Sequence, residues 1–62
     1  MSSPQKSLDM VSKLHNIRVC IFEAEKFLSE GYNDEIILGG KNFKNVVKCI
    51  AYFKKEYDEI MD

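Results

Sequence analysis

Residues 10–28 read MVSKLHNIRVCIFEAEKFL, and this stretch decides the predicted fold. Its apolar side chains recur at alternating intervals of four and three residues, the spacing that keeps one face of an α-helix against a partner along its whole length. The stripe comprises Met10, Leu14, Ile17, Ile21, Ala24 and Leu28. Because one helix cannot bury such a stripe alone, the stretch predicts a helix packed lengthwise on a second helix.

The residues around the stripe mark the ends of this first helix. Ser2 or Ser3 can cap its N-terminus, and Pro4 suits the first helical position because the N–H that proline lacks is not needed there. Gly31 can adopt the left-handed conformation that often ends a helix. We therefore expect the first helix over about residues 4–30.

A second stretch shows the same alternation and predicts a helix over about residues 42–61. Its stripe comprises Phe43, Val46, Ile50, Phe53, Tyr57 and Ile60. Antiparallel packing of the two helices would pair the stripes layer by layer, with the residue numbers in each pair summing to 70 or 71. The predicted layers are Leu28–Phe43, Ala24–Val46, Ile21–Ile50, Ile17–Phe53, Leu14–Tyr57 and Met10–Ile60.

The charges favour the same orientation. Each predicted helix carries lysines towards its start and carboxylates towards its end, against the preference of its own dipole. Antiparallel packing places the basic end of one helix beside the acidic end of the other. Since exposed ion pairs contribute about 0–1 kcal/mol each, they select the orientation more than they stabilise the fold.

The connection between the helices contains a capping pattern and a glycine pair. Asn33 followed by two acids predicts a short helical turn over about residues 33–38, and Gly39-Gly40 would end it. An extended segment over 36–38 is the alternative, but it would need a second subunit to supply a pairing strand. The predicted fold class is therefore all-α, a single helical-hairpin domain over residues 1–62.

Both predicted helices have more apolar positions than one helical hairpin can bury. At 100° per residue, these positions flank the stripes on two opposite edges. The Phe22 edge comprises Val11, Phe22, Val47 and Ala51, with His15 between Val11 and Phe22; the Phe27 edge comprises Cys20, Phe27, Cys49 and Tyr52. A chain of 62 residues is too small to leave both edges in water, so we expect a homo-oligomer, most simply a dimer that forms a four-helix bundle. The alternatives are a foreign partner or coverage of one edge by residues 36–38.

Few residues carry catalytic or ligand-binding chemistry. His15 has Ser12 one turn away but no orienting carboxylate, so we expect an interface role and no catalytic residues. Cys20 and Cys49 sit in the middle of the predicted helices and are interpreted as buried apolar side chains, with a redox pair as the alternative. One histidine and two cysteines at these spacings predict neither a metal site nor a cofactor.

The chain shows no signal-peptide or membrane-spanning pattern, and its net charge of −1 gives no general attraction to membranes or nucleic acids. We expect a cytoplasmic protein.

Two local basic features could still bind an anion or a nucleic acid. Gly40 and Lys41 at the predicted start of the second helix could contact an anion. The predicted lysine face comprises Lys41, Lys44, Lys48 and Lys55, within one arc of the second helix.

These observations predict a small non-enzymatic regulator, inhibitor or adaptor that acts as a homo-oligomer by binding another macromolecule, most simply a protein. Compact helical proteins of this size are common among the inhibitors and adaptors of phages and mobile elements, so this interpretation rests on size and class. Two alternatives stay open. One is nucleic-acid binding by the lysine face, and the other is binding of a small phosphate-bearing ligand at a subunit interface near Gly40 and Lys41.

Overall fold

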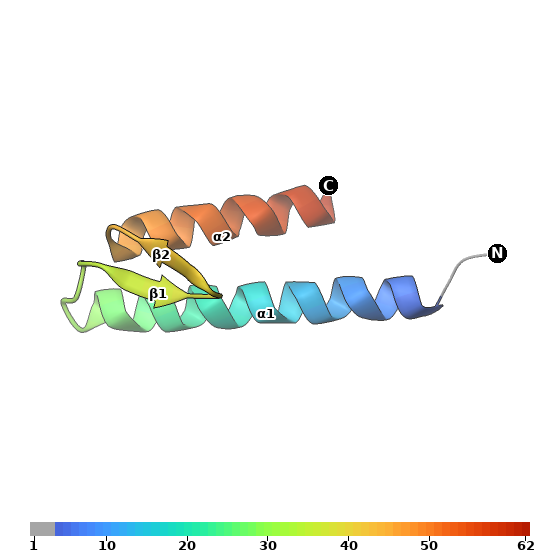
Figure 1. Cartoon of the computed structure of the whole chain (residues 1–62), viewed down its shortest axis with the longest axis horizontal. Helices are drawn as coiled ribbons and strands as arrows, with labels where there is room; N and C mark the ends of the chain where they lie inside the picture. Colours follow the sequence, from blue (N-terminus) through green and yellow to red (C-terminus); the bar gives the residue numbers. More distant parts are fainter. Residues whose placement is uncertain (1–3) are drawn as a thin grey trace.

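Two helices and a small antiparallel sheet make up the chain. The computed structural model describes the backbone of residues 4–62 and the side chains of residues 9–62. The elements in order are α1 (Pro4–Ser29), β1 (Ile36–Leu38), β2 (Lys41–Phe43) and α2 (Val46–Met61). Figure 1 shows α1 and α2 running antiparallel, side by side, with the two strands beside their connected ends. The predicted two-helix architecture is confirmed, whereas the predicted cap, Ser2 or Ser3, lies outside the described residues.

The connection is a β-hairpin, so the prediction of a helical turn over residues 33–38 and of an all-α chain is wrong. Strands β1 and β2 pair antiparallel from Ile36–Phe43 to Leu38–Lys41. Gly39 and Gly40 form the two-residue turn between them, with φ of 59° and 75°. A two-residue hairpin of type I′ needs positive φ at both turn positions, which glycine adopts without strain. The glycine pair thus turns the chain back on itself, and no second subunit is needed to pair β1.

Because β2 uses Lys41–Phe43, helix α2 begins at Val46 and not at residue 42. Its N-terminus is capped twice. The Asn45 Oδ1 atom accepts a hydrogen bond from the Lys48 N–H at 2.8 Å. The Asn33 Oδ1 atom accepts from the N–H groups of Val46 and Val47, at 2.9 and 3.2 Å. These side chains satisfy three of the four N–H groups that the first turn of a helix leaves free.

Helix α1 ends as its sequence predicts. It stops at Ser29, and Gly31 follows in the left-handed region with φ of 89°. The Tyr32 N–H then donates to the Phe27 carbonyl oxygen at 3.0 Å, which satisfies one of the last free carbonyl groups of the helix. The chain can therefore turn away from α1 within a few residues.

The core lies between the two helices and the β-hairpin. Its buried apolar residues are Ile17, Ala24, Ile36, Val46, Cys49 and Phe53. Both members of the predicted layers Ala24–Val46 and Ile17–Phe53 are therefore buried. The centre of the helical hairpin is built from the stripes that the sequence shows.

The predicted register is wrong at the end where α2 begins. Phe43 belongs to β2, so the layer Leu28–Phe43 does not exist within the helix pair, and Leu28 is exposed. Towards the other end Tyr57 packs against the core, and its hydroxyl oxygen accepts a hydrogen bond from the Arg18 guanidinium at 2.8 Å. The physical reason is that the β-hairpin, rather than a continuous helix, sets where α2 begins.

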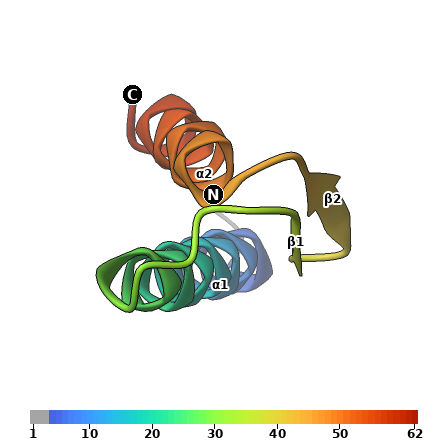
Figure 2. The same ribbon diagram turned by 90° about the vertical axis from the view of Figure 1, so that its left-hand side faces the viewer.

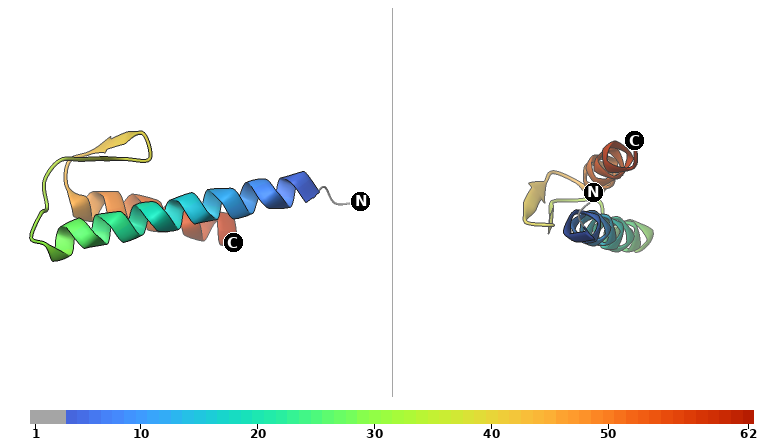
Figure 3. Two further views of the ribbon diagram at one scale, coloured as in Figure 1. Left: turned by 90° about the horizontal axis from the view of Figure 1, so that it is seen from below. Right: turned by 90° about the vertical axis from the view of Figure 1, so that its right-hand side faces the viewer.

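The β-hairpin covers Cys20, Cys49 and Tyr52 of the Phe27 edge, while Phe27 itself stays 41% exposed. Figures 2 and 3 show both strands on one side of α1 and α2, while no other described element lies on the opposite side. A β-carbon at Gly39 would lie 3.5 Å from the Cys20 Sγ atom and 2.9 Å from the Phe53 Cζ atom. The ring of Phe43 packs against that of Tyr52, with the ring centres 5.4 Å apart. This is the predicted alternative in which residues 36–38 cover one edge.

The molecule is elongated, with principal extents of 48 × 18 × 16 Å. Its radius of gyration of 13.3 Å exceeds the value of about 10.6 Å expected for a compact domain of this length. Helix α1 has 26 residues and α2 has 16, so the N-terminal part of α1 extends beyond the end of α2 (Figure 1). Met10, predicted to belong to the last core layer, lies near this extension and is exposed.

Candidate binding surfaces

The Phe22 edge remains open. Val11 is 62% exposed, Phe22 is 68% exposed and Val47 is 49% exposed. Ala51 and His15 are exposed as well. Phe22 lies about 200° around α1 from Cys20, which contacts the β-hairpin, so this edge faces away from both strands. The structure therefore leaves uncovered one of the two apolar edges that the sequence predicts.

Polar contacts fill the groove between the helices on this open side. The Lys54 ammonium lies 3.9 Å from the Glu25 carboxylate. The Arg18 guanidinium donates to the Tyr57 hydroxyl and also lies over the Tyr57 ring, 5.4 Å from its centre. The exposed apolar side chains therefore lie beside this groove, on the outer surfaces of the helices.

One further exposed apolar residue joins the Phe22 edge on α1. Val19 is exposed and continues the line of Val11, His15 and Phe22 at intervals of four, four and three residues. We call these four residues the outer row of α1. The prediction omitted Val19 because it considered only positions next to the core stripe, although the spacing of the row is visible in the sequence.

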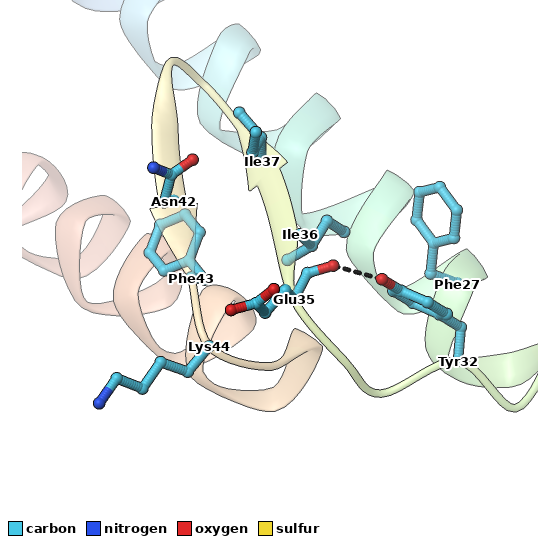
Figure 4. Close-up of a pocket in the computed structure, with 8 residues that line it drawn as sticks. All are labelled: Phe27, Tyr32, Glu35, Ile36, Ile37, Asn42, Phe43 and Lys44. Carbon is cyan, nitrogen blue, oxygen red and sulfur yellow. Dashed lines mark hydrogen bonds between the residues drawn. The ribbon is translucent and has the colours of Figure 1, made fainter.

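A second apolar surface lies beside the β-hairpin, near the C-terminal end of α1 (Figure 4). It is an open groove of about 720 Å³. We call it the hairpin groove. Its lining residues are Phe27, Tyr32, Glu35, Ile36, Ile37, Asn42, Phe43 and Lys44. The Phe27 and Tyr32 rings pack against each other with their centres 5.7 Å apart. Ile37 is 70% exposed on β1, so the groove offers both aromatic and aliphatic contact surface.

Of the predicted interface residues, the hairpin groove contains only Phe27. Tyr52 lies elsewhere, packed against Phe43 and Phe53. The sequence signal that would have revealed Ile37 is the glycine pair, because the alternation of side chains along β1 places Ile36 inward and Ile37 outward.

The outer edge of β1 is partly closed to an incoming strand. In an antiparallel pair the backbone groups of alternate residues point away from the partner strand, and before β1 this position is Glu35. The Tyr32 hydroxyl donates to the Glu35 carbonyl oxygen, and the Glu35 N–H donates to the Asp34 carboxylate at 2.8 Å. These bonds occupy the outward-facing backbone groups of Glu35, whereas Ile37, the middle residue of β1, also directs its N–H and C=O away from β2.

The predicted lysine face does not exist as one helical arc. Lys41 lies in β2 and Lys44 lies between β2 and α2, so only Lys48 and Lys55 share α2. On α2, Tyr52 lies between Lys48 and Lys55, one turn from each. The Lys41 ammonium lies 5.4 Å from the centre of the Tyr52 ring.

The predicted anion contact also loses its structural basis. Gly40 and Lys41 belong to the turn and to β2, so neither opens a helix. The true N-terminus of α2 already binds the side-chain oxygens of Asn33 and Asn45. A phosphate there would have to displace these caps, which weakens the interpretation as a phosphate site.

Both thiols lie on the side that the β-hairpin covers. Burial raises the pKa of the Cys49 thiol, and the neighbouring Cys20 raises it further. Burial also raises the pKa of the Cys20 thiol, with a smaller contribution from the Glu23 carboxylate. Since the thiolate is the reactive form, this environment favours the interpretation of both residues as packed apolar side chains.

Among the residues that the structure describes, no three His, Cys, Asp or Glu side chains gather closely enough to hold a metal ion. Neither described helix is long and apolar enough to cross a membrane. In comparisons with known proteins, the chain matches no protein-family model, no curated protein and no solved structure.

Proposed function

We propose that this protein is a small non-enzymatic regulator or adaptor that acts as a homo-oligomer, most simply a dimer, by binding another macromolecule. The observation that carries the proposal is that so small a chain exposes two separate apolar surfaces, the Phe22 edge and the hairpin groove. Exposed apolar surface on a small protein usually marks an interface. Two such surfaces, on different sides of one molecule, support self-association together with binding of a partner.

The two surfaces differ in a way that suggests how the roles divide. The Phe22 edge lies along the helices, where a helix of a second copy can pack against it. The hairpin groove is concave, and its rim carries one acid and one base, Glu35 and Lys44 (Figure 4). An apolar groove with a balanced rim suits a protein segment better than a nucleic acid, whose phosphates require excess positive charge.

The test is native mass spectrometry of the protein isolated gently from the cells that produce it. We expect two chains with the additional mass of a bound protein. Ile37→Glu should remove the additional mass and leave two chains, because it places a charge in the hairpin groove. Lys41→Glu is the matched control, since it puts the same acid on the same β-hairpin outside the groove. Retention of the bound protein by Ile37→Glu would contradict the assignment of the groove.

Nucleic-acid binding is the second candidate, and one observation favours it. Lys48, Tyr52 and Lys55 follow one another on α2, and Lys41 lies over the Tyr52 ring. Lysines beside an exposed aromatic ring form a surface on which single-stranded nucleic acid can bind by charge and stacking. Tyr52 is half-buried, however, which limits the ring surface available to a base.

Salt dependence separates this candidate from protein binding. If nucleic acid binds, affinity for a labelled single strand should fall steeply as the salt concentration rises fourfold, from about 50 to about 200 mM, because salt weakens every phosphate contact. The double variant Lys48→Glu/Lys55→Glu should then lose binding, whereas Ile37→Glu should keep it. If binding of the strand changes neither with salt nor with the lysine substitutions, nucleic-acid binding by this surface is excluded.

A further inference from the structure

The outer row of α1 has the geometry of a seam between two identical helices. Its members, Val11, His15, Val19 and Phe22, recur at intervals of four, four and three residues, an 11-residue repeat of about 3.67 residues per turn that also keeps one face of a helix against a partner. The row runs from residue 11 to residue 22, so its midpoint falls between residues 16 and 17. The midpoint of α1 itself, Pro4–Ser29, falls at the same place. Two copies of α1 that pack antiparallel along the row would therefore overlap over their full length.

The chain exposes more surface than a compact protein of its mass, by about the area that a second copy would cover. The accessible surface is 4976 Å², whereas a compact monomer of 7.2 kDa exposes about 4,100 Å². The excess of about 850 Å² is close to the roughly 800 Å² that each partner buries in a standard protein interface. The elongated shape of the molecule accounts for this excess, which leaves enough exposed surface for an interface of standard size.

We propose that the occupant of the Phe22 edge is a second copy of this chain, bound through an antiparallel α1–α1 contact with a two-fold axis near residues 16 and 17. In this arrangement Val11 packs against Phe22 of the second copy, and His15 packs against Val19 of the second copy. Each pair occurs twice, as an isologous interface requires. The proposal rests on the self-association in the proposed function and adds its face, its direction and its symmetry.

The polar contacts between α1 and α2 place the seam on α1 and not in the groove between the helices. Both the Lys54–Glu25 ion pair and the Arg18–Tyr57 hydrogen bond lie in that groove. A second copy seated in the groove would desolvate these groups, which is costly for charged side chains. Packing along the outer row leaves them at the rim of the interface, and it leaves the hairpin groove free for another macromolecule.

Sedimentation equilibrium tests whether the outer row of α1 forms the dimer contact. Wild-type protein should sediment as two chains, and Phe22→Glu should halve that mass because its charge would be buried against Val11 of the second copy. Phe27→Glu is the matched control: it makes the same change on the other side of the same helix and should remain dimeric. Val19→Lys provides a second disruption, and circular dichroism confirms that each variant remains helical.

Cysteine cross-linking tests whether the two copies of α1 run antiparallel. Under mild oxidation, a mixture of the single variants Val11→Cys and Phe22→Cys should form a covalent dimer that neither variant forms alone. Wild-type protein, which has only its two covered thiols, controls for the native cysteines. Self-cross-linking of each single variant would show a parallel contact and overturn the proposal.

The outcomes also separate this inference from the proposed function. A stable dimer that Phe22→Glu and Val19→Lys leave intact would overturn the assigned face while keeping the oligomer. A wild-type monomer at all concentrations would overturn both the seam and the oligomeric part of the proposed function. Loss of a bound protein on Ile37→Glu, with the number of chains unchanged from wild type, would support the separate role of the hairpin groove in either case.

Discussion

Gly39 sets how closely the β-hairpin approaches the helices. A β-carbon there would lie 2.9 Å from the Cζ atom of Phe53, closer than packed carbon atoms normally come. The Phe53 ring is buried between the Phe43 and Tyr52 rings, so it has little room to move. We expect Gly39→Ala to lower the free energy of unfolding by about 2–3 kcal/mol, as the sum of backbone strain at positive φ and overpacking. Urea denaturation measures this change.

Gly40 is the matched control for that prediction. It has a similarly positive φ of 75°, but a β-carbon there would meet nothing within 4 Å. Gly40→Ala should therefore cost only the backbone strain, about 1 kcal/mol. Equal losses at both glycines would mean that the close approach of the turn to Phe53 contributes nothing to stability.

The buried Cys49 thiol and the half-buried Cys20 thiol make the stability of the fold depend on alkaline pH. Burial raises the pKa of both Cys20 and Cys49 in the folded state. A raised pKa means that the folded chain holds its thiol protons more tightly than the unfolded chain does. The resulting stabilisation is complete below the thiol's ordinary pKa of 9.0 and is lost as the pH rises through the folded pKa. We expect the free energy of unfolding to fall as the pH is raised above about 9.

The measurement is urea denaturation at a series of pH values from neutral to alkaline. The variant Cys49→Ala serves as the reference, because it removes the buried thiol and leaves every other titratable group in place. It should be less stable at neutral pH, because it leaves a cavity, yet lose less stability on going to alkaline pH. A variant curve that runs parallel to the wild-type curve would show that Cys49 titrates alike in both states.

At the scale of elements, one side chain outside α2 fixes where that helix begins. The Asn33 Oδ1 atom accepts hydrogen bonds from Val46 and Val47, and this ties the segment after α1 to the start of α2. We expect Asn33→Ala to lower the free energy of unfolding by about 1–2 kcal/mol, the usual effect of losing a helix cap. Asn33→Asp should retain most of the stability, because it keeps the accepting oxygen and adds a negative charge that the helix N-terminus favours.

Thermal and urea denaturation of the two variants check this prediction side by side. If the aspartate variant is as unstable as the alanine variant, the hydrogen bonds from Val46 and Val47 are not the source of the effect. The Asn45 cap is an internal reference, since Asn45→Ala removes only the single bond to the Lys48 N–H.

The helices were predictable because their signals are local and repeated. The stripe from Met10 to Leu28 and the left-handed Gly31 fix α1 to within one residue at its C-terminal end. The β-hairpin was missed because Asn33 and two acids mimic the start of a helix, while the decisive signal is the pair Gly39-Gly40. A run of only three residues on each side of that pair carries too little periodicity to distinguish strand from helix.

The candidate surfaces were predictable to a different degree. The Phe22 edge follows from helix geometry alone, since the positions of Val11 and Phe22 around α1 do not depend on the loop. The hairpin groove does not follow from the sequence in this way. Its contacts join Phe27 and Tyr32 to Ile37, and their proximity depends on how the β-hairpin folds back over the helices. No periodic pattern in the sequence predicts a tertiary arrangement of this kind.

At the scale of the whole molecule, the exposed outer row predicts that stability depends on protein concentration. If folding and dimerisation are coupled, each tenfold dilution removes about 1.4 kcal/mol per dimer, and the midpoint of thermal unfolding should fall by about 5 °C. Circular dichroism over a hundredfold range of concentration measures this shift. The midpoint of Phe22→Glu should be lower and should not change with concentration, because that variant unfolds as a single chain. A wild-type midpoint that stays constant over the same range would show that one chain is stable without a partner, despite the exposed area of Val11, Val19 and Phe22.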